Sequence, residues 1–254
     1  MKEHYTEVIK KNEDGTEEKF QIFVVKPNNE IAGAAERYRS NFWMKCIKDG
    51  VPTRQEVADL MKERKIWDED KEKELKQMRE ELGILERKLF LGNGDTKRMK
   101  LSDGKQVAIE MRKLRMKIQD FAAVKIEMEN NSAEALADNA RFDYYVANCT
   151  YSGETLQKVY SSIEEFNSKN TDETANAASA KLYEVIYNIS NKVIENIPEN
   201  RWLKKFGLVD DEYSLIDKDK HNIDLDGRRI DKEGYFLNDE GKRIDKFGNL
   251  LNAE

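Results

Sequence analysis

The sequence predicts a mainly α-helical protein with an N-terminal β-hairpin, a helical bundle with a long antiparallel helical hairpin, and C-terminal short-strand seven-residue β-repeats. Three observations lead to this fold class. Two strand-like runs flank Asp14-Gly15 near the N-terminus. Two heptad patterns of apolar residues fill the middle of the chain. Near the C-terminus, an apolar residue followed by Asp or Asn returns every seven positions, too short a period for a helical solenoid.

The composition restricts both the core and the function. The 254-residue chain is 39% hydrophobic and 37% charged, so little apolar core is available per residue. Long helices tolerate this ratio, because a narrow apolar stripe can join two helices while their other faces stay charged. The 44 basic and 50 acidic residues give a net charge of −6 without a broad cationic face, so we do not expect nucleic acid binding.

The sequence also bears on localisation. It contains nothing close to eighteen consecutive apolar residues, so no membrane association is expected. Met1 to Lys11 lack the basic start and apolar run of a secretory signal. Cys46 and Cys149 are far apart and form neither a disulfide framework nor a metal-binding pair. We therefore expect a protein that is made and kept in a cytoplasm, with both thiols reduced.

The first predicted domain, residues 1–28, is the β-hairpin. Tyr5–Ile9 and Phe20–Val25 are its strands, and Asp14-Gly15 is a hairpin-turn signal between them. Because an isolated hairpin is marginal in water, it must pack either on the helices that follow or on a neighbouring chain.

Residues 29–67 form a predicted helical head. The apolar spacing from Ile31 to Ile47 predicts a helix that stops at Gly50. Thr53 and Glu56 have the spacing of a capping box and start a second helix. Trp67 then closes the head.

Residues 68–130 are predicted to form an antiparallel coiled-coil hairpin. Each arm is on the order of 35 Å long at about 1.5 Å per residue. Gly92, Asn93, Gly94 and Asp95 suit the turn, and Ser102 is the predicted cap of the second helix. The two heptad stripes comprise Leu75, Met78, Leu82, Leu85 and Leu89, and Val107, Met111, Leu114, Ile118 and Phe121.

Residues 131–207 are predicted to form a second helical domain. Ser132, Ser162 and Thr171 are its predicted helix starts. The stretch Cys149–Val159 indicates a small turn or hairpin. A last short helix runs from Pro198 to Gly207, with proline at its start and glycine at its end.

Residues 208–254 are the predicted repeat domain, which we call the tail. Asp or Asn is expected to hydrogen-bond to the local backbone, while Gly supplies positive φ. The repeats open at Ile216-Asp217, Ile223-Asp224, Ile230-Asp231, Leu237-Asn238, Ile244-Asp245 and Leu251-Asn252. This pattern predicts very short strands that alternate with tight turns.

No catalytic or cofactor site emerges from the spacing of reactive residues, and we expect neither enzymatic activity nor a cofactor. His4 and His221 lie near opposite ends of the chain, which leaves no histidine-based catalytic or metal site. Gly92 and Gly94 lack the lysine-serine ending of a phosphate-binding loop. Basic runs such as Arg112–Arg115 are surrounded by acidic residues, so they are assigned to charged helix surface.

One segment of the tail resembles a calcium loop. Asn222–Gly227 followed by Glu233 nearly has the ligand spacing of an EF-hand. However, Arg229 stands at the usual apolar position, Arg228 adds a second positive charge, and no amphipathic helix flanks the segment. We therefore assign the acidic residues to turns and leave calcium binding by the tail open.

The interaction residues are expected near and within the tail. Short strands expose backbone groups that another chain can pair with by strand addition. Large apolar side chains can anchor a partner as readily as they fill a core. The candidate partner-binding residues are Trp202 and Phe206, as the anchor of the tail, followed by Ile230, Tyr235, Leu237 and Ile244.

The N-terminal hairpin, the charged helical hairpin, the segment Pro198–Leu203 and the Asp226-Gly227-Arg228 style of the tail together resemble uncharacterised proteins of tailed bacteriophages, particularly the T4-like group. This resemblance covers most of the chain and carries no active-site motif. It implies a non-enzymatic virion structural protein, such as a component of the phage tail, or an assembly factor. Such a protein binds other virion or assembly proteins, in the virion or the host cytoplasm.

Three alternatives stay open. A homo-oligomer would cover the surplus strand edges. A phage-encoded regulator would bind a host protein machine such as RNA polymerase through its acidic helices. A small metal-dependent enzyme is the third.

Overall fold

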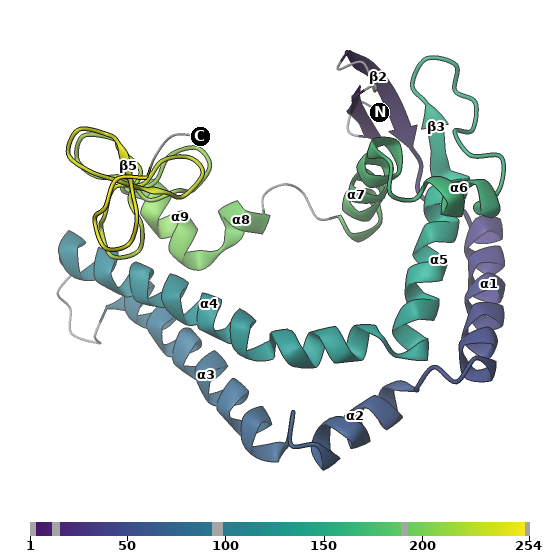
Figure 1. Ribbon diagram of the computed structural model, residues 1–254, viewed down its shortest axis with the longest axis horizontal. Coiled ribbons are helices and arrows are strands. Elements are labelled where there is room, and N and C mark those ends of the chain that lie inside the picture. Colours follow the sequence, from purple (N-terminus) through teal and green to yellow (C-terminus); the bar gives the residue numbers. More distant parts are fainter. Residues whose placement is uncertain (1–3, 12–15, 93–98, 189–192, 252–254) are drawn as a thin grey trace. The chain divides into compact units, whose positions relative to one another are not determined.

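The protein is mainly helical and begins with an antiparallel β-hairpin, as the sequence predicts. The computed structural model describes residues 4–11, 16–92, 99–188 and 193–251. The chain forms two compact units, of which the first consists of Met1–Asp68 and Ala123–Asn191 and the second of Glu69–Ala122 and Lys192–Glu254. Figure 1 shows the elements of both units. The division into five consecutive domains stays a prediction.

The first unit contains a three-stranded antiparallel sheet in the order β1-β2-β3. Its strands are β1 (Tyr5–Lys11), β2 (Glu17–Val24) and β3 (Thr150–Ser152). Val8 lies opposite Phe20 in the hairpin, and Val24 lies opposite Thr150 in the second pair. The sequence predicted only a turn or hairpin around β3, whereas the structure adds this strand to the edge of β2. The predicted hairpin turn at Asp14-Gly15 is outside the described residues.

The core of the first unit lies beneath this sheet. Helix α7 (Glu173–Tyr187) packs on β1 and β2, so the hairpin is buried against helices of its own chain. The inner side chains of the sheet, of α7 and of α5 (Ala133–Cys149) form one apolar cluster with those of α6 (Ile163–Lys169). Its largest buried members include Val8, Ile22, Val24, Val146, Phe166 and Leu182.

Helices α1 (Asn29–Lys48) and α5 lie side by side in the first unit (Figure 1). Two ion pairs join them: Arg39 Nε lies 2.7 Å from Asp138 Oδ1, and Arg141 Nη1 lies 3.2 Å from Glu36 Oε2. The two helices run antiparallel, because the earlier residue of α1, Glu36, pairs with the later residue of α5, Arg141.

Side-chain caps start most helices of the first unit. Thr53 and Glu56 form the predicted capping box of α2 (Arg54–Glu63). Ser132 caps α5 and Ser162 caps α6, also as predicted. The predicted start of α7 at Thr171 is wrong by one residue. Asp172 is its cap, because its carboxylate oxygen accepts the Ala175 N–H at 2.6 Å.

The long helices of the second unit are α3 (Glu69–Leu91) and α4 (Leu101–Asn130), of which α4 continues into the first unit. The predicted stripes are largely buried, with Leu75, Met78, Leu85 and Leu89 in α3 and Val107, Met111 and Leu114 in α4. The heptad pairing of the two helices stays a prediction.

Two details of the predicted helical hairpin are affected by the structure. Ser102 does not cap α4, because the helix already begins at Leu101 and the Ser102 hydroxyl bonds to the Asp103 carboxylate. The turn residues Asn93, Gly94 and Asp95 are outside the described residues.

No helix in the described ranges is long and apolar enough to cross a membrane.

The second unit ends with two short helices and the tail. Helix α8 spans Val193–Asn196 and α9 spans Pro198–Lys205, with proline at the first helical position as predicted. In the tail, β4 (Phe236–Leu237) pairs antiparallel with β5 (Arg243–Ile244). The other strand contacts in the described tail are single bridges between residues, so the chain there is mostly turns.

Candidate interaction surface on the C-terminal tail

Each turn of the tail is held by one acidic or amide side chain. Asp224 is typical, because its Oδ1 atom accepts the backbone N–H groups of Asp226 at 2.9 Å and Arg228 at 2.8 Å. Gly227, with φ of +86°, completes this turn. The same pair of bonds is accepted by Asp210, Asp217, Asp231, Asn238 and Asp245.

Backbone hydrogen bonds connect successive turns. Ile216 N–H donates to Leu208 C=O at 3.1 Å, and Ile223 N–H donates to Leu215 C=O at 2.9 Å. Later bonds of the same kind join Ile230 to Asn222, Leu237 to Arg229 and Leu251 to Arg243. The apolar residue that opens each of these turns therefore donates its N–H to a carbonyl of an earlier turn, so backbone hydrogen bonds link the turns in order.

Ion pairs between side chains also link the turns of the tail. Arg229 lies 3.3 Å from Asp217 and 3.6 Å from Asp219, and Arg243 lies 2.6 Å from both Asp231 and Glu233. Burial alone would raise the pKa of Asp231, but hydrogen bonds from Tyr235 and Arg243 and the charge of Arg243 lower it overall. The acidic residues of the tail are thus largely engaged with their own chain.

Helix α9 fixes the base of the tail within the second unit. Trp202 and Leu203 are buried, and the indole of Trp202 packs directly on Gly104 of α4. Glu199 is 1% exposed and holds Arg115 through two hydrogen bonds, at 2.7 and 3.0 Å. The Glu199–Arg115 pair and the Trp202 ring thus both join α9 to α4.

Arg112 extends that junction to the first turn of the tail. Its guanidinium donates to Asn200 Oδ1 at 2.6 Å and to the Tyr213 carbonyl at 2.8 Å. Burial lowers its pKa, and the charges of Glu199 and Asp210 partly oppose this effect. The basic run Arg112–Arg115 therefore contributes both arginines to internal contacts.

The candidate partner-binding residues differ in their exposure. Trp202 is buried and acts within the chain. The ring of Phe206 lies against it at a tilt, with ring centroids 4.5 Å apart, and Phe206 is 44% exposed. Tyr235 is 47% exposed, and its ring lies under the Arg243 guanidinium. The remaining three candidates, Ile230, Leu237 and Ile244, are half-buried between the turns.

Exposure of apolar side chains increases along the tail. Val209, Leu215, Ile216 and Ile223 in the first turns are all buried. In contrast, Tyr235, Phe247, Leu250 and Leu251 are exposed, and Phe247 reaches 79%. We call these four residues the distal tail surface. The sequence named only Tyr235 among them, because the period alone does not tell which turns are covered.

A group of potential metal ligands lies near the start of the tail. Ligand atoms of Asp217, Asp219 and His221 lie within 4.8 Å of one another. However, Arg229 pairs with both aspartates, and the Asp217 carboxylate already accepts the N–H groups of Asp219 and His221. In the segment that resembles a calcium loop, the Asp224 carboxylate is engaged with Asp226 and Arg228 in the same way. Turn formation accounts for these acidic residues.

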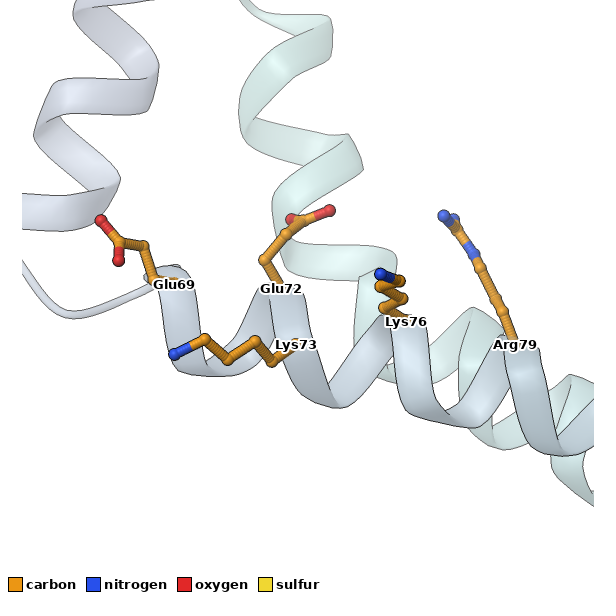
Figure 2. A pocket seen from close by; sticks show the side chains of 5 residues that line it. All are labelled: Glu69, Glu72, Lys73, Lys76 and Arg79. Carbon is orange, nitrogen blue, oxygen red and sulfur yellow. The ribbon is translucent and has the colours of Figure 1, made fainter.

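A hollow of about 450 Å³ lies along the first turns of α3. Figure 2 shows the five side chains that line it, Glu69, Glu72, Lys73, Lys76 and Arg79, all of which project from this one helix. Lys73 and Lys76 pair with Asp70 and Glu80 of the same helix, at 3.4 and 3.9 Å. A row of charges on one helix is typical of a solvated surface.

Sequence patterns missed three residues that matter for this architecture. Gly104 was one helical residue among many, and only its contact with Trp202 shows why a side chain is absent there. Glu199 and Asn200 belong to a recognisable segment, but nothing in their spacing predicted arginine partners on α4.

Comparisons with protein-family models, with curated proteins and with solved structures find no match to this chain.

Proposed function

We propose that the protein is a non-enzymatic structural or assembly protein of a bacteriophage particle that acts through protein-protein contacts made by its tail. The phage setting rests on the resemblance of the sequence. The mode of action rests on one observation, the distal tail surface: Tyr235, Phe247, Leu250 and Leu251 are exposed on a chain that is otherwise strongly charged. Contiguous exposed apolar patches are typical of protein interfaces, and we propose that these four side chains form one.

The proposed architecture explains how the tail could present this surface. Seven-residue β-turn repeats form a short ladder, and a coiled-coil pair formed by α3 and α4 carries it. Trp202, Glu199 and Arg112 hold the base of the ladder on α4. A partner would then meet a rigid surface, which reduces the entropy lost on binding.

The first test is quantitative mass spectrometry of purified particles and assembly intermediates of the encoding phage. A structural protein is expected at a fixed stoichiometry in the particle, and an assembly factor in the intermediates alone. Absence from both would contradict the proposal. Recovery of host RNA polymerase subunits with the native protein would instead support the alternative of a phage-encoded regulator.

The second test locates the contact. The double variant Tyr235→Ser with Phe247→Ser removes exposed rings whose described ring contacts are with the basic side chains of Arg243 and Lys246, so it should fold normally yet lose incorporation. Ile84→Ser is the matched control, because Ile84 is 62% exposed on α3 outside the tail. Normal incorporation of the double variant would show that the tail is not the docking element.

A further inference from the structure

A cleft of about 290 Å³ lies in the first unit between α1, α5 and α6. Tyr38 and Phe42 line it from α1, Asn139 and Asp143 from α5, and Asn167 from α6. Its volume is at the lower end of the range for small-molecule pockets, on the order of 300 Å³. The cleft therefore suits a side chain or another small group.

The Asp143 carboxylate is the only ionisable group among these residues that is charged at neutral pH. It is half-buried, and burial raises its pKa. Within the described residues it has no hydrogen bond or ion pair. Two arginines of the same helix pair already have carboxylate partners, since Arg39 holds Asp138 and Arg141 holds Glu36. A partly desolvated carboxylate without a cation attracts one.

The other groups around Asp143 favour a flat cation with several N–H donors. The rings of Tyr38 and Phe42 lie 6.4 Å apart, and such rings attract a cation over their faces. The side-chain carbonyls of Asn139 and Asn167 are acceptors. Guanidinium fits this set better than ammonium, because it is planar, stacks on aromatic rings and binds a carboxylate through two hydrogen bonds.

We propose that this cleft binds the guanidinium group of an arginine side chain presented by a partner protein. Asp143 would accept two of its N–H groups, one aromatic ring would cover its face, and the asparagine carbonyls would accept the remaining donors. The site uses no residue of the tail, so it goes beyond the proposed function and stands or falls independently of it.

The test is an NMR titration of the ¹⁵N-labelled full-length protein with a capped peptide that contains one arginine. The same peptide with citrulline, which has nearly the same shape without the charge, is the control ligand. Saturable shifts of the Asn139, Asp143 and Asn167 backbone amides are expected with arginine alone. Equal shifts with citrulline, or no shifts with arginine, would overturn the proposal.

Variants assign the contacts. Asp143→Asn should weaken arginine binding at least tenfold, while Asp59→Asn, a change of the same kind at an exposed position of α2, should leave it unchanged. Tyr38→Leu should weaken binding and Tyr38→Phe should retain it, because the ring and not the hydroxyl is required. Circular dichroism of each variant checks the fold. Wild-type affinity in a folded Asp143→Asn protein would contradict the assignment.

A free metabolite with a guanidinium group is the other source of this chemistry. Free L-arginine carries an additional ammonium and carboxylate, and the capped peptide does not. If the site accepts a partner's side chain, the peptide should bind at least as tightly as free arginine. Clearly tighter binding of free arginine would contradict a protein partner and indicate a metabolite site.

Discussion

Trp202 packs so closely on Gly104 that no other residue fits at that position of α4 without a shift. A Cβ atom built on Gly104 would lie 2.3 Å from Cζ2 and 2.6 Å from Cη2 of the indole. Since α9 leads directly into the tail, this contact sets where the tail begins on α4. Glycine is here a packing requirement, despite its cost in a helix.

Gly104→Ala should destabilise the protein by about 1–3 kcal/mol, the usual cost of an overpacked contact. Urea unfolding measures the change. Gly83→Ala on α3 is the matched control, because no atom lies within 4 Å of its added Cβ, and it should stabilise by up to about 1 kcal/mol. If Gly104→Ala proved as stable as Gly83→Ala, the close contact would not exist in solution.

Glu199→Gln should cost about 2 kcal/mol, because it weakens two charge-assisted hydrogen bonds to Arg115 at a buried position. The loss can be followed by urea unfolding at pH 7. As a comparison, Lys113→Met breaks the exposed pair with Asp226 and should change stability by less than about 1 kcal/mol. Equal effects of the two changes would show that burial adds nothing to the Glu199 pair.

The tail should lose order in acid. The pKa of Asp217 is lowered first by the His221 backbone hydrogen bond, and that of Asp245 by the Asn249 side chain. A carboxylate whose pKa is lower in the folded protein than in the unfolded chain stabilises the fold when it is ionised. Its contribution to the free energy of unfolding is therefore present above about pH 3.8, the unfolded-state pKa, and is lost as the pH falls below it. Amide chemical shifts of the turn glycines, recorded against pH, should report the transition.

Asp224→Asn should keep its turn, whereas Asp224→Ala should open it. Asn238 already accepts the N–H groups of Glu240 and Lys242 through the same atom, which shows that an amide oxygen suffices. Hydrogen exchange of the Arg228 amide would measure the difference, with faster exchange expected for alanine only. Equal protection in both variants would remove the side-chain bond as the cause of the turn.

Asp143→Asn should raise the free energy of unfolding slightly at pH 7 when no ligand is present. Burial raises the pKa of Asp143 in the folded protein above its value in the unfolded chain. Ionisation of Asp143 therefore destabilises the fold as the pH increases from the unfolded-state pKa to the folded-state pKa. The stability difference between variant and wild type should accordingly vanish below pH 3.8. A variant less stable than wild type at neutral pH would indicate that the carboxylate has a stabilising partner.

The sequence by itself determined the local structure. Thr53 with Glu56 and Ser132 start their helices because a side-chain oxygen meets the free N–H groups of a helix end a few residues away. Pro198 begins α9 because its missing N–H costs nothing there. All of these effects act over three or four residues, and so can be inferred from spacing alone.

Only the tertiary structure decided which distant residues meet. The third strand at Thr150, the fit of Trp202 on Gly104 and the position of Asp143 in a cleft all depend on segments that lie far apart in the sequence. The residue types allow many such partners, since shape and burial emerge only when the helices pack. For the same reason, the period of the tail could not tell that its early apolar residues are covered and its late ones exposed, which packing decided.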